Sequence, residues 1–428
     1  MRDGDTIVAL SSGGLPSGIA VIRLSGPGAL SGLETFCGGV PAPRRLALRP
    51  FVVEGDTIDT GLIAAFPAPN SFTGEDCAEL QMHGSTAVVR KILRTLTALP
   101  GFRLAIAGEF TRRAFENGRL DLTEVEGLGD LLEAETESQR RLAVARLDGH
   151  LSRQISRWRE ALLDLRAEIE ARIDFSDEGD VGELPASFAS GIATLRADLE
   201  TALQGFDRGR QTREGLRVAL AGLPNAGKSS LINALSQSDG AIVTAEPGTT
   251  RDIREVGLDL NGHKLILIDM AGLRKTTSLA EAEGVRRASA EIARADLVLW
   301  LDAPGRQFDP PESAAPIWRI ATKADLLDNF SKSAISTLTG QGISALLDRL
   351  GNFATEFTMS LEPLLISHER DHEALTDTLH WLTNVPHHQL ELAAENLRLA
   401  SSALERLVGI IDAERVLDRL FSAFCIGK

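Results

Sequence analysis

A glycine-rich motif at residues 222–229, GLPNAGKS, carries the clearest chemistry in this sequence. It fits the pattern G-x-x-x-x-G-K-[ST], in which backbone N–H groups surround phosphate oxygens, the lysine brings positive charge to the β- and γ-phosphates, and the hydroxyl binds Mg²⁺. A strand-forming run precedes the motif and helix-forming residues follow it, as this chemistry requires. Lys228 is therefore expected to bind phosphate and to assist catalysis. The predicted nucleotide contacts in this loop are Asn225, Ala226, Gly227, Lys228, Ser229 and Ser230.

Two motifs farther along the chain predict contacts to the metal and the base. Asp269 ends the strand-forming run KLILID, where a carboxylate for the Mg²⁺ shell belongs in addition to the hydroxyl of the phosphate loop. Gly272 is expected to approach the γ-phosphate. The segment Thr322-Lys323-Ala-Asp325 follows the run IWRIA. The Asp325 carboxylate can accept two parallel hydrogen bonds from the N1–H and N2–H₂ groups of guanine, a donor pair that adenine lacks. We predict GTP as the nucleotide, with Lys323 and Asp325 at its base.

Together these motifs resemble a translation-factor-type GTPase domain that spans residues 213–355. That class usually has Asn where this chain has Thr322, so the usual amide is missing. The run Ser336–Gly340 is only a weak match to the Ser-Ala loop that contacts guanine in the class. Asp325 therefore carries most of the guanine prediction.

The residue that activates water is not marked by the nucleotide motifs. Leu273 stands where Ras-like enzymes place a water-orienting Gln, so another group must do this work. Glu281 is the predicted replacement, with Glu283 as the rival, and a solvated helix charge is the alternative for both. No arginine finger is evident, but Asn225 can help to hold a monovalent cation where such a finger would place positive charge.

Hydrophobic periodicity predicts the elements that position these residues. Apolar runs at 6–10 and 18–24 predict strands, and a helical stretch at 86–99 makes the amino-terminal region α+β. Amphipathic helices are expected over residues 120–175, with a break at Gly149, and again after residue 356. Between them, buried strands alternate with helices. We predict a multidomain α/β and α+β chain, in which a doubly wound, mostly parallel P-loop domain is inserted into a helical domain built from two segments.

Composition limits the possible classes of protein. The chain has 428 residues, and 45 Lys+Arg against 60 Asp+Glu give a net charge of −15, which argues against an overall basic nucleic-acid coat. Any nucleic acid must therefore bind at a local basic patch. The 3 cysteines lack metal-type spacing, which favours a reducing compartment. With neither a basic amino-terminal leader nor a long apolar run, the expected location is the cytoplasm, without a membrane partner.

Segments outside the GTPase motifs resemble one family, the MnmE (TrmE) tRNA uridine 5-carboxymethylaminomethyl modification GTPases. The resemblance spans the whole chain and its order of domains. The segments that carry it are PNSFTGED (69–76), ELQMHG (79–84), GEFTRRAF (108–115), RLDL (119–122) and the terminal CIGK (425–428).

The resemblance implies a division of the chain and a folate site. The implied domains are residues 1–118, binding a tetrahydrofolate derivative and mediating dimerisation; 119–212 and 356–428, forming the helical domain; and 213–355, the GTPase domain. The cofactor would be 5-formyl- or methylene-tetrahydrofolate. Its implied contacts are Arg23, Glu79, Lys428 and Arg119, the last replacing a usual Lys. Cys425 is interpreted either as a free thiol or as a catalytic group beside the folate.

The family also implies a potassium-dependent mechanism. The matching K⁺ ligands are Asn225, Thr244, Glu246 and Thr249, and Thr250 matches the switch threonine that joins Ser229 on Mg²⁺. Glu281 matches the water-orienting acid. Pro247 and Met270 depart from commoner residues without removing a named side-chain ligand. The implied partners are a second copy of the chain, the FAD protein MnmG in a heterotetramer, and tRNA, modified at C5 of its wobble uridine, position 34.

Three alternatives remain open from the sequence. A GTP-dependent switch in ribosome assembly is the runner-up function, and a structural dimer scaffold without useful turnover is a weaker one. A set of arginines is interpreted either as a basic face for tRNA phosphates or as partners in helix-surface salt bridges. These arginines are Arg112, Arg113, Arg140, Arg141, Arg153, Arg157 and Arg159.

Overall fold

The computed structural model forms two compact units, which we describe separately. Unit 1 comprises residues 1–129 and 404–428, and unit 2 comprises residues 130–403. The structure describes residues 4–174, 184–238, 241–242, 254–270, 291–304, 309–310, 312–326, 334–358, 365–386, 389–409, 421, 424 and 427. No helix within these ranges combines the length and hydrophobicity needed to cross a bilayer.

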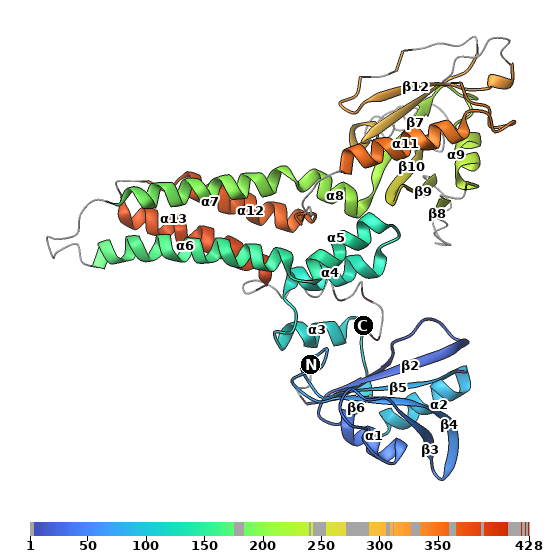
Figure 1. The fold of residues 1–428 in the computed structure, drawn as a ribbon, viewed down its shortest axis with the longest axis vertical. Coiled ribbons are helices and arrows are strands. Elements are labelled where there is room, and N and C mark those ends of the chain that lie inside the picture. Colours follow the sequence, from blue (N-terminus) through green and yellow to red (C-terminus); the bar gives the residue numbers. More distant parts are fainter. Residues whose placement is uncertain are drawn as a thin grey trace, which may run out of the picture. The chain divides into compact units, whose positions relative to one another are not determined.

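Unit 1 is built on a six-stranded sheet with the order β3-β4-β5-β2-β1-β6 (Figure 1). Only β1 and β6 pair in parallel; the other neighbours are antiparallel. The strands are β1 (Thr6–Leu10), β2 (Ser17–Ser25), β3 (Ala47–Val53), β4 (Asp56–Phe66), β5 (Cys77–Gly84) and β6 (Phe102–Leu104). The predicted strands at 6–10 and 18–24 are confirmed, as is the helix predicted at 86–99.

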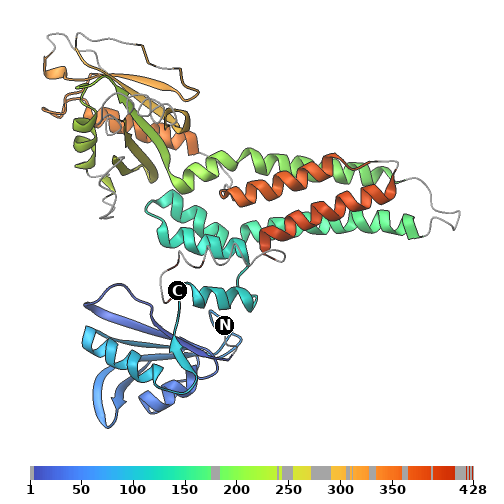
Figure 2. The same ribbon diagram turned by 180° about the vertical axis from the view of Figure 1, so that it is seen from behind.

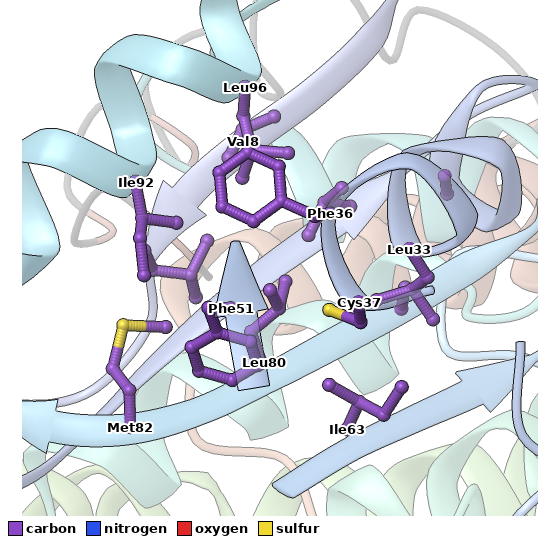
Figure 3. Close-up of a cluster of buried hydrophobic side chains, with 14 of the residues drawn as sticks. Val8, Leu33, Phe36, Cys37, Phe51, Ile63, Leu80, Met82, Ile92 and Leu96 are labelled. Atoms are coloured by element: carbon purple, nitrogen blue, oxygen red, sulfur yellow. The ribbon is translucent and has the colours of Figure 1, made fainter. Parts of the chain in front are cut away.

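Two helices pack on this sheet and enclose its core. These are α1 (Ala29–Cys37) and α2 (Thr86–Thr97). Strand residues with period 2, such as Ile22, Leu24 and Leu80, meet Leu33 and Ile92 of the helices, and all five are fully buried. Figure 3 shows this cluster between the helices and the strands. The other face of the strands is therefore the one that can present polar groups.

Two further helices follow in unit 1, which also holds the end of α13 (Leu390–Val408). They are α3 (Glu109–Glu116) and α4 (Leu122–Glu133), the latter ending in unit 2. Phe421 and Phe424 from the carboxyl-terminal end pack against Leu122 and Val125 of α4. The carboxyl-terminal end and α4 thus share one hydrophobic cluster, because these rings would otherwise face water.

Unit 2 begins with helices from both sides of residues 213–355, the predicted GTPase domain. Before it come α5 (Glu137–Leu147), α6 (His150–Asp174), α7 (Ala186–Gln204) and α8 (Phe206–Glu214); after it come α12 (Glu369–Thr383) and α13 (Leu390–Val408). Figures 1 and 2 show α12 and α13 alongside α6 and α7. Gly149 separates α5 from α6 with a left-handed φ of 73°, as the predicted break requires. The helical domain built from two segments is confirmed.

A fully buried ion pair joins the two segments of this helical domain. Arg146 of α5 donates to the Asp371 carboxylate of α12 at 2.7 Å, and both side chains have 0% exposure. Arg146 also donates to the Leu365 carbonyl at 2.5 Å, just before α12. Because a buried charge without its partner is costly, this pair fixes how the returning chain meets α5.

The rest of unit 2 is a six-stranded sheet with the order β12-β11-β7-β10-β9-β8. Its strands are β7 (Leu216–Gly222), β8 (Ala241–Ile242), β9 (Arg254–Leu260), β10 (His263–Asp269), β11 (Leu297–Asp302) and β12 (Ile317–Ala321). β7 pairs in parallel with β10 and β11, and β11 with β12, while β9 runs antiparallel to β10. The helices α9 (Lys228–Ser236) and α11 (Ile343–Thr358) pack on the shared core. This is the predicted doubly wound, mostly parallel sheet.

One half-buried carboxylate, that of Asp296, fixes the start of β7. Asp296 accepts a hydrogen bond from the Arg217 backbone N–H at 2.8 Å and from the Gln211 side-chain amide at 2.6 Å. Burial raises the pKa of Asp296, and these hydrogen bonds oppose that effect only in part. Since Gln211 lies on α8, the strand that leads into the phosphate loop is anchored to the helix before it.

Candidate nucleotide-binding site

The phosphate loop joins β7 to α9 through an unusual backbone path. Gly222, Asn225 and Gly227 have φ values of 142°, 65° and 97°. At Gly222 a Cβ atom would lie 2.6 Å from the Leu301 carbonyl oxygen, so only glycine fits. The α9 helix begins at Lys228, which directs its first, unpaired N–H groups toward the loop. The loop is therefore shaped to surround an anion.

Three predicted side chains converge where the carboxyl ends of two parallel strands meet. Ser229 donates to the Asp269 carboxylate at 2.8 Å, and Asp269, at the end of β10, is 4% exposed. Lys228 is 8% exposed, and its ammonium group donates to the carbonyls of Gly222 and Leu223 at 2.8 and 3.0 Å. A hydroxyl and a carboxylate this close form a pair of hard oxygen donors, which fits a Mg²⁺ ligand set.

A cavity of about 540 Å³ lies over the loop. Sequence motifs identified its polar side but did not identify its apolar wall of Met270, Ile292 and Trp300. Met270 directly follows β10 and Trp300 lies near the end of β11, so the rule that ligands bind beyond the carboxyl ends of parallel strands could have indicated these two. Ile292 precedes β11, and that rule does not mark it. The other lining residues are Ala221, Gly222, Leu223, Pro224, Asn225, Gly227, Lys228, Ser229 and Ser230.

The segment predicted to recognise the base begins after β12. Lys323 has a left-handed φ of 57° and is followed by a short 3-10 helix, η2 (Ala324–Leu326), which carries Asp325. The Ser336 hydroxyl donates to the Asp325 carboxylate at 2.5 Å, and Ser336 is fully buried. The weak Ser336–Gly340 match therefore has a role that sequence spacing did not reveal: it orients the carboxylate predicted to read guanine.

Thr322 faces inward, away from solvent. It is 4% exposed, and its hydroxyl lies 2.8 Å from the Ala226 carbonyl in the phosphate loop and 3.3 Å from the Asp302 carbonyl. The Thr322 backbone N–H also donates to the Asp302 carbonyl at 2.9 Å. The base segment and the phosphate loop are thus directly bonded.

Several predicted site residues lie outside the residues that the structure describes. They are Thr244, Glu246, Thr249, Thr250, Gly272, Glu281, Glu283, Cys425 and Lys428. Their predicted roles remain predictions.

Unit 1 holds the described residues predicted to contact folate. Arg23 donates to the Glu79 carboxylate at 3.0 Å from directly opposite positions on β2 and β5. The Arg23 guanidinium also lies 5.6 Å from the centre of the Phe72 ring and 5.9 Å from that of Phe110. Phe72 is 38% exposed, so a flat aromatic face is available beside an ion pair.

The loop of residues 67–76 contacts both Arg23 of the Arg23–Glu79 pair and Arg119. A Cβ atom on Gly74 would lie 3.2 Å from Cγ of Arg119, so the arginine stem packs against this loop, which also carries Phe72. Near the end of the chain, Gly427 has a φ of 99°, and a Cβ there would lie 2.3 Å from the Leu10 carbonyl oxygen. Ser11 donates to the Gly427 carbonyl at 2.8 Å. Gly427 thus lies against the end of β1.

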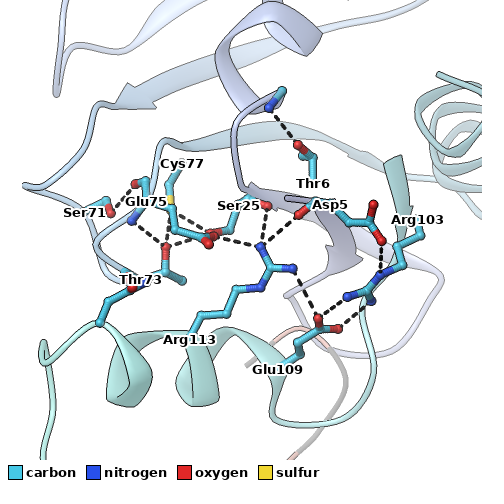
Figure 4. Close-up of polar contacts among 12 residues, drawn as sticks. Asp5, Thr6, Ser25, Ser71, Thr73, Glu75, Cys77, Arg103, Glu109 and Arg113 are labelled. Carbon is cyan, nitrogen blue, oxygen red and sulfur yellow. Dashed lines mark hydrogen bonds and ion pairs between the residues drawn. The ribbon is translucent and has the colours of Figure 1, made fainter. Parts of the chain in front are cut away.

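A buried polar network explains much of the 69–76 and 108–115 motifs (Figure 4). Glu109, 1% exposed, accepts hydrogen bonds from Arg103 at 2.9 and 2.5 Å and from the Ile106 backbone N–H at 2.9 Å. Arg113 donates to the Glu75 carboxylate at 2.8 Å. Burial acts to raise the pKa of Glu109, but the hydrogen bonds from Arg103 and Ile106 and the charges of Arg103 and Arg113 together outweigh it, so that this pKa lies below its ordinary value of 4.5. These buried contacts therefore stabilise the fold of unit 1.

The arginines considered as a basic face are largely engaged by neighbouring groups. Arg140 and Arg141 both pair with Glu137 at 2.8 Å, and Arg112 pairs with Glu116 at 2.9 Å. Arg113 is buried in the network described above. For these four arginines the salt-bridge interpretation is the one that the contacts favour.

The fold and the site define the class of this protein. A phosphate loop between a parallel strand and a helix, an aspartate at the end of the neighbouring strand and a Lys-x-Asp base segment together make a P-loop GTPase.

Comparisons with known proteins give the family. A family model for the MnmE helical domain matches residues 122–425, and one for the GTP-binding protein TrmE N-terminus matches residues 6–119. The tRNA modification GTPase MnmE of Azorhizobium caulinodans is 49% identical over 437 residues, covering 100% of both chains. That of Brucella canis is 49% identical over 434 residues, covering 99% of this chain and 98% of its own. The chain belongs to the MnmE family and is a GTP hydrolase that acts in tRNA modification, which decides against the ribosome-assembly alternative.

Solved structures match smaller parts of the chain. The G domain of T. maritima FeoB is 25% identical, covering 34% of this chain and 99% of its own, with a TM-score of 0.24. Aquifex aeolicus Era is 20% identical, covering 39% of this chain and 66% of its own, with a TM-score of 0.26.

Proposed function

We propose that this protein is a potassium-dependent GTPase that works with the FAD protein MnmG on tRNA. The modification is addition of an aminomethyl or carboxymethylaminomethyl group to C5 of the wobble uridine, position 34. The observation that carries the proposal is the Ser229–Asp269 pair at the edge of a cavity that Lys228 and Asn225 also line. The test is GTP hydrolysis in K⁺ and in Na⁺, with and without the purified FAD protein, scored beside the modified nucleosides by mass spectrometry.

Lys228 and Mg²⁺ act on the phosphates. The Lys228 ammonium group is already held within the loop, where it can exchange carbonyl partners for β- and γ-phosphate oxygens without leaving its position. Ser229 and Thr250 would hold the Mg²⁺, with Asp269 behind Ser229. The metal supplies charge neutralisation for the phosphates.

Asn225 contributes to the potassium site together with Thr244, Glu246 and Thr249. It lines the cavity at a turn of the loop with positive φ, before the start of α9, which supports a role beside the phosphates of bound GTP. Bound K⁺ supplies the positive charge that an arginine finger supplies elsewhere. Glu281 orients water. We expect Glu281→Ala to retain GTP binding and nearly abolish turnover; equal rates in K⁺ and Na⁺ would reject the cation's role.

Asp325 reads the guanine base. Ser336 holds one carboxylate oxygen, and the carboxylate retains lone pairs for N1–H and N2–H₂. Asp325→Asn exchanges acceptors for a donor and should therefore favour XTP over GTP. A variant that keeps its GTP preference would refute this reading.

A tetrahydrofolate derivative binds in unit 1 through Arg23, Glu79, Arg119 and Lys428. Arginine or lysine can clamp the glutamate tail, and Glu79 can accept from the pterin N–H groups. The exposed Phe72 ring supports the proposal because the pyrimidine ring of a reduced pterin keeps flat faces that can pack on an aromatic ring. Calorimetry with 5-formyl-tetrahydrofolate should detect binding that Arg23→Ala weakens, and the absence of heat with the unaltered chain would contradict it.

Cys425 is proposed to lie beside the folate. Cys37 and Cys77 are each only 4% exposed, and burial raises the pKa of Cys37 to about 12, so neither should react with iodoacetamide in the folded protein. Native alkylation should thus report Cys425 alone, and folate should slow it. A folate-independent rate would remove Cys425 from the site.

The assembly is proposed to be a homodimer that joins MnmG as a heterotetramer. The domains proposed to act in it are residues 1–118, 119–212 with 356–428, and 213–355. Light scattering of the chain alone and mixed with MnmG tests both assemblies.

A further inference from the structure

Thr322 connects the two ends of the nucleotide site. Its hydroxyl is 2.8 Å from the carbonyl of Ala226, a residue 96 positions earlier in the phosphate loop. Both residues are buried, at 4% and 1% exposure. A buried carbonyl needs a partner, and this hydroxyl supplies one. The bond therefore holds the phosphate loop to the segment that carries Asp325.

The proton of this hydroxyl has one favoured acceptor. A threonine hydroxyl has a single donor, whereas an asparagine amide has two. The competing Asp302 carbonyl is farther from it, at 3.3 Å, and already accepts the Thr322 backbone N–H at 2.9 Å. The proton therefore goes to Ala226.

This choice affects how the base is read. Guanine presents N–H donors on one edge and two acceptors, N7 and O6, on another. Asp325 can satisfy the donor edge. An asparagine at position 322 could bond Ala226 with one proton and a base acceptor with the other, but threonine cannot do both.

We propose that Thr322 is a positioning and specificity-determining residue, which holds the phosphate loop through Ala226 and leaves N7 of guanine unread. The inference rests on the proposed reading of guanine by Asp325. It predicts that the binding affinity of this protein does not depend on N7 of the base, in contrast with that of a GTPase that has Asn at this position.

The test compares GTP with 7-deaza-GTP, in which a C–H replaces N7, by equilibrium binding to the full chain. We expect the two affinities to agree within about twofold, since no hydrogen bond is lost. A preference for GTP of threefold or more would overturn the proposal. This measurement needs no variant, so it does not depend on whether a substituted protein folds.

Three substitutions at the same position separate the two roles. Thr322→Val keeps the shape and removes the hydroxyl, so both nucleotides should bind about fivefold more weakly with an unchanged ratio. Thr322→Ser keeps the hydroxyl and should bind both like the unaltered chain. Thr322→Asn should acquire a preference for GTP over 7-deaza-GTP of about fivefold. Unchanged affinity in Thr322→Val, or no gained preference in Thr322→Asn, would overturn the proposal.

Binding of a third nucleotide, ITP, distinguishes failure of the Thr322 proposal from failure of the proposed recognition of guanine by Asp325. ITP lacks only the 2-amino group that Asp325 is proposed to bind. If ITP binds as tightly as GTP, the role of Asp325 has failed; if ITP binds weakly and 7-deaza-GTP also binds weakly, only the role of Thr322 has failed.

Discussion

The phosphate loop and the Glu109 network are both built from polar sequence motifs, yet they do different work. Around Glu109 the polar groups bond to one another, and its side chain has 0% exposure. Around Lys228 similar bonds exist, but they border a cavity of about 540 Å³. Residue types and spacing thus mark a polar cluster, whereas adjacent open space makes it a ligand site.

Backbone shape distinguishes the two regions as well. Three loop positions, Gly222, Asn225 and Gly227, have positive φ, which turns N–H groups toward the cavity. The Glu109 and Arg113 side chains instead project from a regular helix, α3, at i and i+4. The phosphate loop is therefore arranged to bind a ligand, whereas the Glu109 and Arg113 side chains stabilise the fold itself.

Removing the loop lysine should produce the largest effect. Lys228→Ala deletes the charge next to the phosphates, and we expect a loss of about 10²–10³-fold in kcat/KM for GTP hydrolysis. Lys91→Ala, which removes an exposed surface lysine, is the matched control and should leave the rate unchanged. Steady-state phosphate release measures both. Similar rates in the two variants would show that the loop does not act on phosphate.

Removing the Glu109 carboxylate should lower the stability of unit 1 and leave GTP binding unchanged. Glu109→Gln leaves Arg103 and Arg113 with fewer charged partners, and we expect unit 1 to lose about 3 kcal/mol. Hydrogen exchange of β1 and β6 amides reports it, with unchanged GTP affinity. Glu116→Gln, at an exposed pair, is the control. If Glu109→Gln lowered GTP affinity, the separation of the two roles would be wrong.

Lowering the pH should remove the stabilisation that the Glu109 carboxylate provides. Because the pKa of Glu109 in the folded protein lies below 4.5, its ion pairs stabilise unit 1 fully above that pH and less as pH falls through the lowered value. The stability difference between the unaltered chain and Glu109→Gln should therefore be constant at pH 6–8, by about 3 kcal/mol, and shrink below pH 4.5. A difference independent of pH would assign the effect to packing.

The smallest effect is expected at an exposed ion cluster. Bonds from Arg140 and Arg141 lower the pKa of Glu137 to about 2, but solvent screens this exposed group. Glu137→Gln should leave the thermal unfolding midpoint within about 1 °C. Gln139→Ala, which removes a buried amide that donates to the Arg213 carbonyl at 2.7 Å, should lower it measurably. The reverse order would mean that surface charge, not buried bonding, secures α5.

The sequence alone predicted the local features of the protein. Strand and helix periods and the order of the GTPase motifs depend on neighbouring residues, and the structure agrees with them. The Asn261–Gly262 turn between β9 and β10 is also a local feature. The turn has φ values of 56° and 81°, as a two-residue hairpin with Asn-Gly requires. Such features are encoded within a few residues, because backbone preferences act over that range.

The partners of individual polar groups were decided by tertiary structure. Thr322 meets Ala226 and Ser336 meets Asp325 only after β7, β12 and their loops are placed together. Arg113 was considered as a phosphate ligand and is instead buried against Glu75. A hydrogen bond depends on position to within a few tenths of an ångström, and no spacing rule transmits that precision across 96 residues of chain.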